Sequence, residues 1–180
     1  MARATNTDYF HSMRFFVSSS PSNGGYDPLP VAQAGFSTCS TPEASIDAVE
    51  YKEGHMVYTR KFPGTPTMAD ITLARGVALK DTLFYDWMFK VIEGGDQYRT
   101  DLVITHFHRD ALPGYQGLNN PNATAINVAQ TPPSNRQYIV QEAFPLRCKI
   151  AGDLDATSAD VSVAEMDVCY EHFYVQEKAK

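Results

Sequence analysis

The sequence has few cysteines and no long apolar run, and both features limit the classes of protein to which it can belong. The three cysteines, Cys39, Cys148 and Cys169, are an odd number without Cys-x-x-Cys spacing, which predicts reduced thiols rather than a disulfide framework. No apolar stretch approaches the roughly 20 residues that a membrane-spanning helix needs. The polar residues 1–8 lack the apolar segment of a secretion signal. We therefore expect a protein that is made in the cytoplasm, is not secreted by a signal peptide and does not insert into a membrane.

Basic residues and catalytic motifs are also scarce. The chain carries 15 basic and 21 acidic residues, a formal net charge of −6. A nucleic-acid-binding surface needs a basic stripe, so this balance argues against one and favours a surface that repels polyanions. No P-loop, Gly-x-Gly-x-x-Gly or Gly-x-Ser-x-Gly motif occurs, so nucleotide binding and hydrolase activity have no positive support. We expect no enzymatic activity and no cofactor.

Aromatic residues are abundant and favour strands. Ten Phe, ten Tyr and a hydrophobic share of 43% in 180 residues fit one β-rich domain, residues 1–180, with a proper core. Turn signals recur about every ten residues, and the last predicted strand has a bulge or bend near Glu165–Met166. We expect a mainly β fold, a β-sandwich or partly open barrel with one α-helix packed on one side. The predicted strands are residues 13–18, 34–38, 44–50, 70–75, 100–108, 137–144, 146–150 and 161–175.

The predicted helix starts near Leu83, where the apolar spacing becomes helical. Asp81 would cap it or be its first-turn acid, and Gly94-Gly95 would end it. An aromatic ring on such a stripe favours core packing over ligand binding. The residues expected to pack the helix onto the sheet are Leu83, Phe84, Trp87, Met88 and Val91, and the stripe continues to Ile92.

Two segments indicate extensions from the body. Pro63-Gly64 and Pro66 predict a turn or loop. Residues 55–62 alternate without a clean apolar face, which is typical of an exposed hairpin, so we expect an extended arm near residues 50–66. Residues 112–135 are polar and rich in turn chemistry, and they predict a loop insertion.

In this order, the motifs resemble the tail tube protein family of contractile phage tails and contractile injection systems. The resemblance runs from about Phe15 to Val175 and is specific through the order and spacing of its motifs. The motifs are Gly35-Phe-Ser37, Tyr51-Lys-Glu-Gly54, Lys61-Phe-Pro-Gly64, Ile71-Thr-Leu-Ala-Arg-Gly76, Leu83-Phe-Tyr-Asp-Trp87, Arg99-Thr-Asp101, Ala143-Phe-Pro145, Asp153-Leu-Asp-Ala156 and Val163-Ala-Glu-Met-Asp-Val168.

The resemblance implies an inner tube subunit that forms hexameric rings stacked around a lumen. Ring formation would complete the open sheet, because each unpaired edge would meet a neighbour's. The arm would contact the next ring through Glu53, Tyr58, Arg60, Lys61 and Phe62. The implied partners are a contractile sheath, baseplate and spike proteins, and DNA or protein cargo that passes without specific binding. The subunit would be made in the bacterial cytoplasm and become part of a phage virion or phage tail-like particle.

Two other functions remain open at this point. A β-sandwich can be a ligand-binding module, for example for carbohydrate. Alternatively, His106 and His108 share one face of a strand, so both imidazoles could reach one metal ion in a small metal-dependent enzyme. Such a site would need a third ligand, for which Glu171 or His172 is a candidate.

Overall fold

The computed structural model describes residues 10, 12–20, 27–29, 35–78, 81–94, 98–107, 135–154, 157 and 160–178. Within these ranges the chain is mainly β with a single helix, which confirms the predicted fold class. The elements are β1 (Phe15–Ser20), β2 (Thr38–Cys39), β3 (Glu43–Tyr51), β4 (Arg60–Ala69), β5 (Ile71–Gly76), α1 (Leu83–Ile92), β6 (Thr100–Phe107), β7 (Asn135–Lys149), β8 (Val163–Cys169) and β9 (His172–Lys178).

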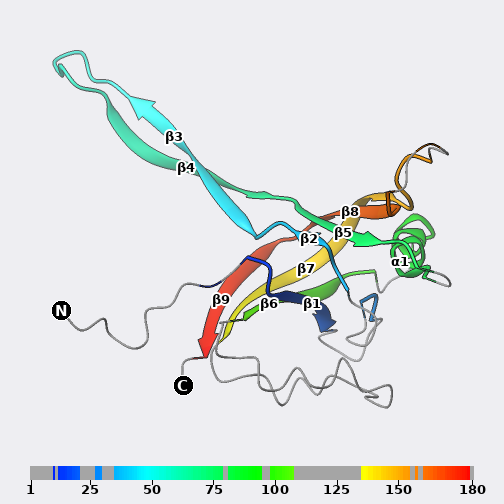
Figure 1. The fold of residues 1–180 in the computed structure, drawn as a ribbon. Helices are drawn as coiled ribbons and strands as arrows, with labels where there is room; N and C mark the ends of the chain where they lie inside the picture. Colours follow the sequence, from blue (N-terminus) through cyan, green and yellow to red (C-terminus); the bar gives the residue numbers. More distant parts are fainter. Residues whose placement is uncertain are drawn as a thin grey trace, which may run out of the picture.

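The body of the molecule consists of two antiparallel strand groups that share β7 (Figure 1). One group runs β1-β6-β7-β9 and the other runs β7-β8-β5-β2. The long strand β7 reaches both groups because it bends at Glu142, whose φ of 54° is positive. The Glu142 amide donates to Asp101 Oδ1 at 3.1 Å beside this bend. In the described residues the strands do not close into a barrel, so the body has open edges.

The prediction of two strand segments separated by Pro145 is wrong. Pro145 lies inside β7, where the pairing with β8 shifts register between Pro145 and Arg147. Such an irregularity accommodates the missing backbone donor of proline without ending the strand.

The prediction of one final strand with a bulge or bend near Glu165–Met166 is also wrong. The chain leaves its strand at Tyr170–Glu171, between β8 and β9. This break moves it from the β5-β8 group to the β6-β9 group, with β7 as the neighbour on both sides. Through Glu165 and Met166, β8 alternates regularly between half-buried and buried side chains.

The core lies between the two strand groups and under α1. It is apolar and draws on five strands, the helix and two connecting segments, as expected when alternating side chains of facing strands meet. The buried residues are Val17, Leu29, Ile71, Leu73, Phe84, Trp87, Leu102, Ile104, Val140, Ala143, Ala164, Met166, Val168 and Tyr170.

Helix α1 packs on the body mainly through Phe84 and Trp87, which are buried. The Trp87 indole nitrogen Nε1 donates to the backbone oxygen of Tyr98 at 2.8 Å, so the polar atom of this ring is satisfied. Leu83, Met88 and Val91 are half-buried. Ile92 is 67% exposed, so the predicted apolar stripe stops short of it.

The ends of α1 differ in part from the prediction. Thr82, not Asp81, is the N-cap residue. Asp81 still serves the first turn, because its Oδ1 accepts from the Leu83 amide at 3.4 Å. At the other end, Gly94 has a φ of +72°, a conformation that favours glycine just beyond a helix.

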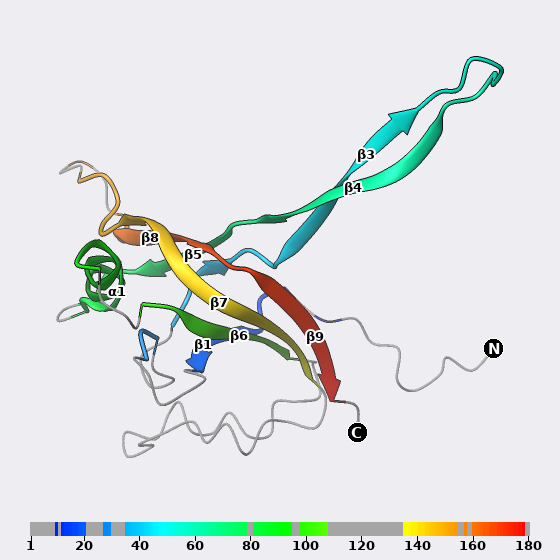
Figure 2. The same ribbon diagram turned by 180° about the vertical axis from the view of Figure 1, so that it is seen from behind.

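Strands β3 and β4 form a separate two-stranded ribbon that projects from the body, away from α1 (Figures 1 and 2). We call this ribbon, residues 43–69 with its connecting loop, the arm. The predicted loop at Pro63-Gly64 and Pro66 is wrong, since all three residues lie inside β4. Each strand of an isolated ribbon has an unpaired edge, so proline is tolerated there.

Gly64 has a specific role in the arm. The pairing of β3 with β4 shifts between Ile46 and Ala48, and Gly64 lies opposite this irregularity. A Cβ atom at Gly64 would lie 2.8 Å from the backbone oxygen of Asp47. Only glycine therefore allows this close approach of the two strands.

Candidate assembly interface

The arm is attached to the body through Tyr170. This buried side chain points its hydroxyl at Glu43, the first residue of β3. The hydroxyl accepts from the Glu43 amide at 3.1 Å and donates to the Glu43 carbonyl oxygen at 3.1 Å. Burial is the main cause that raises the pKa of Tyr170, so the hydroxyl keeps the proton that this donation requires.

A second attachment involves Ser40 and Thr72. The Ser40 amide donates to the Thr72 carbonyl oxygen at 3.0 Å, and the Thr72 amide donates to Ser40 Oγ at 2.8 Å. These bonds tie the chain just before β3 to strand β5. The base of the arm is therefore held at both Ser40 and Glu43, which gives the ribbon a defined direction.

The outer half of the arm has two different faces. In an antiparallel pair, directly opposed residues lie on the same face. Val49 lies opposite Phe62 and Tyr51 lies opposite Arg60, which places two aromatic rings and a valine together. The other face carries Glu50 opposite Lys61, whose charged groups are 3.2 Å apart.

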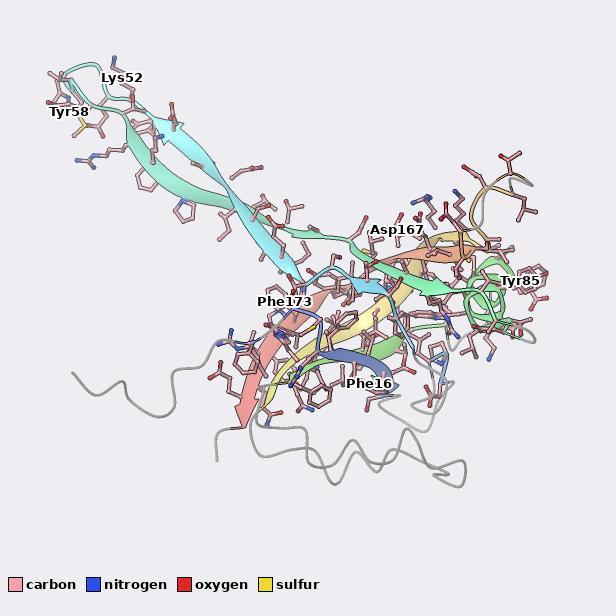
Figure 3. All side chains as sticks on the ribbon, in the orientation of Figure 1. Phe16, Lys52, Tyr58, Tyr85, Asp167 and Phe173 are labelled. Atoms are coloured by element: carbon pink, nitrogen blue, oxygen red, sulfur yellow. The ribbon has the colours of Figure 1, made fainter. Side chains whose placement is uncertain are left out.

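Both faces of the arm are open to solvent. All nine residues of β3 are exposed, as are eight of the ten in β4. At the tip, Val57 and Tyr58 are each 84% exposed, and Figure 3 shows Tyr58 and Lys52 at the end farthest from the body. An apolar ribbon face without a core beneath it indicates a protein-contact surface.

The structure places the predicted interface residues along this outer half. Tyr58, Arg60, Lys61 and Phe62 are exposed, and Glu53 is half-buried at the tip. Sequence reasoning missed the apolar partners that β3 contributes, because they depend on the strand register. These exposed residues are Ile46, Val49 and Tyr51, together with Val57 in the loop.

At the opposite end of the molecule, Arg75 and Asp81 form a buried ion pair beneath α1. The guanidinium also lies over the rings of Phe36 and Phe84, 5.9 and 5.6 Å from their centroids. Arg75 Nε and Nη1 are buried without a partner in the described residues. A cavity of about 20 Å³ that Arg75 lines has room for a single water molecule.

Three arginines on the surface of the body, Arg99, Arg136 and Arg147, are paired with carboxylates. Arg147 donates to Asp167 at 2.8 Å and lies 3.4 Å from Glu165. Its hydrogen bond is the main cause that lowers the pKa of Asp167. Arg99 pairs with Glu171 and Arg136 pairs with Glu177. These pairs neutralise basic groups that would otherwise attract a polyanion.

The histidine pair of the metal hypothesis is only partly described. His106 lies in β6, opposite Phe15 of β1. His108 and most of the insertion predicted at 112–135 lie outside the described residues. In the part of the chain that the structure describes, no group of three His, Cys, Asp or Glu side chains could hold a metal ion. In that same part, no helix has the length and apolar character to cross a membrane.

Comparison with known families identifies the chain's relatives. The model of the T4-like virus tail tube protein gp19 family matches residues 11–174. The chain belongs to this tail tube protein family. The suspected resemblance is therefore confirmed, and neither the ligand-binding module nor the metal-dependent enzyme gains support. No curated protein sequence matches the chain.

Solved structures show the same fold. A chain of the PVC sheath–tube complex, an extracellular contractile injection system in its extended state, has a TM-score of 0.70 and 22% identity, covering 98% of this chain and 99% of that one. A chain of the anti-feeding prophage cap has a TM-score of 0.69 and 20% identity, covering 98% and 96%. A chain of the anti-feeding prophage baseplate has a TM-score of 0.68 and 18% identity, covering 94% and 97%.

Proposed function

We propose that this tail tube protein is the structural inner tube subunit of a contractile tail or contractile injection system. It would assemble into hexameric rings that stack around a lumen, with no enzymatic role and no cofactor. The observation that carries the proposal is the family match across residues 11–174. The open strand edges of the body and the exposed arm support it, because further copies of the chain would cover both.

The proposed partners follow from the relatives. Chains of the same fold occur in sheath–tube, cap and baseplate complexes, so we expect a sheath around this tube and baseplate and spike proteins at its end. The subunit would be made in the bacterial cytoplasm and incorporated into a virion or phage tail-like particle. DNA or protein cargo would pass through the lumen without specific binding, because the net charge is −6 and Arg99, Arg136 and Arg147 of the body are paired with carboxylates.

Electron microscopy of the purified protein tests the proposal. Wild-type protein should form rings, or tubes of stacked rings. Replacing Arg60 and Lys61 together by Glu should weaken stacking, because both lie on the outer half of the arm, and should leave single rings intact. The double variant Arg60→Lys, Lys61→Arg keeps both charges and should form normal tubes. A wild-type protein that stays monomeric at high concentration would refute the function.

A further inference from the structure

A second exposed apolar surface lies at the α1 end of the body. We define the α1-end patch as Val77, Tyr85, Ile150 and Val161, which are exposed large apolar side chains. Three of them, Val77, Tyr85 and Ile150, line one small cavity. The backbone joins the fourth to the group, because the Val77 amide donates to the Ser162 carbonyl oxygen at 2.9 Å. The four residues therefore lie close together, on α1, on the residue that follows β5 and on the segment between β7 and β8.

The arm tip and the α1-end patch lie at opposite ends of the folded molecule. Figure 3 shows Tyr58 at the end of the arm and Tyr85 on α1, on the side of the body away from the arm. Two different surfaces at opposite ends of one molecule make a head-to-tail contact, which does not close in a symmetric pair but leads to a ring or to an open stack. Such a contact suits a stack of rings and would not suit an isolated dimer.

The charges at the two ends are complementary. Between residues 50 and 62 the arm carries three basic and two acidic residues, in a chain whose net charge is −6. Around the patch, acidic residues outnumber basic ones, which opposes the sign of the arm. In the segments that carry the patch, the acidic residues are Asp81, Asp86, Glu93, Asp153 and Asp160, and the basic residues are Arg75, Lys90 and Lys149.

We infer that the arm tip of one subunit, at Val57 and Tyr58, docks on the α1-end patch of a second copy of this chain. This inference rests on the proposed tube function and names the surface that receives the arm. Val57 and Tyr58 are each 84% exposed, and in the patch Ile150 is 56% and Val161 is 76% exposed. Docking removes both sets of apolar side chains from water. The nine residues of β3 give the arm a reach of about 30 Å, enough to extend past its own body.

Photo-crosslinking in assembled tubes tests this contact. A benzoylphenylalanine at position 58 should crosslink to residues 76–93 or 150–163 of another subunit, as identified by mass spectrometry of the crosslinked peptides. The same probe at Ile46, which is exposed but near the base of the arm, should not reach those residues. Tubes in which position 58 crosslinks elsewhere, or to no subunit at all, would overturn the inference.

A substitution in the patch gives a second measurement. Ile150→Glu should raise the protein concentration needed for tube formation by about tenfold or more. Its melting temperature should stay close to that of the wild type, since the side chain is exposed. An unchanged threshold concentration would contradict the inference. Wild-type protein that forms neither rings nor tubes would instead refute the proposed function, and the inferred contact would fail together with it.

Discussion

The body and the arm are both antiparallel β-structure, but their strands are stabilised by different partners. In the body, every second residue of β8 is buried against facing strands and the helix. In the arm, all of β3 is exposed. An isolated two-stranded ribbon is at best marginally stable in water. The body therefore supplies the folding stability of the subunit, and the arm depends on its anchored base and, under the proposed function, on contacts with other subunits.

The largest expected effect comes from the body core. Trp87→Ala should lower the free energy of unfolding by about 3–5 kcal/mol, because it leaves a cavity and removes the indole hydrogen bond to Tyr98. Chemical denaturation measures the loss. Tyr85→Ala on the exposed side of α1 is the control and should cost less than about 1 kcal/mol. Equal losses would show that the helix does not pack as described.

The second largest effect is expected from the buried ion pair at the α1 end. Asp81→Asn removes the counterion of Arg75 with little change in shape, so a buried guanidinium loses its charge partner. We expect a loss of about 3 kcal/mol in unfolding free energy. Asp86→Asn, on the exposed side of the first turn of α1, should cost less than about 1 kcal/mol. An unchanged stability of Asp81→Asn would mean that Arg75 is not held by this pair.

A smaller effect is expected where the two regions meet. Tyr170→Phe removes both hydrogen bonds to Glu43 and should cost about 1 kcal/mol. Hydrogen exchange at the Glu43 amide should accelerate, since this donor loses its acceptor. Tyr174→Phe, at an exposed tyrosine of β9, should leave that amide unchanged. Unaltered exchange in Tyr170→Phe would show that the hydroxyl does not anchor the arm.

The smallest effect should come from the arm tip. Val57→Ser should change the unfolding free energy of the subunit by less than about 0.5 kcal/mol, because Val57 is exposed. The same change at the buried Val17 of the body should cost about 3 kcal/mol, since it removes core contacts and buries a hydroxyl. Chemical denaturation measures both losses of unfolding free energy. Similar losses at both sites would show that the arm and the body do not differ in their contribution to stability.

The sequence predicted the body better than the arm, for physical reasons. Alternation in β8 and the helical spacing after Leu83 both reflect burial within this chain, so they are visible in a single sequence. The predicted apolar stripe extended too far, to Ile92, because periodicity cannot show where the neighbouring strands stop. The strand β7 continued through Pro145 because a register shift against β8 accommodates proline, and such shifts depend on the partner strand.

The arm was harder to predict because its residues are exposed and pack little against the rest of the chain. Pro63 and Pro66 indicate a loop under rules derived from strands inside sheets, whereas both lie in a ribbon with free edges. The apolar face of Val49 and Phe62 depends on a register that shifts next to Ile46. The role of Tyr170 as an anchor was likewise missed, because its bond to Glu43 joins residues 127 positions apart.

Pro63 and Pro66 of β4 would also protect unassembled subunits from aggregation. Freshly made copies would coexist at high concentration, each with a bare apolar ribbon that could template fibrils. Pro63 and Pro66 delete two amide donors from that ribbon, which interrupts the continuous ladder that cross-β growth requires. The arm can thus keep an apolar face for the proposed contact with another subunit and still be a poor template for amyloid.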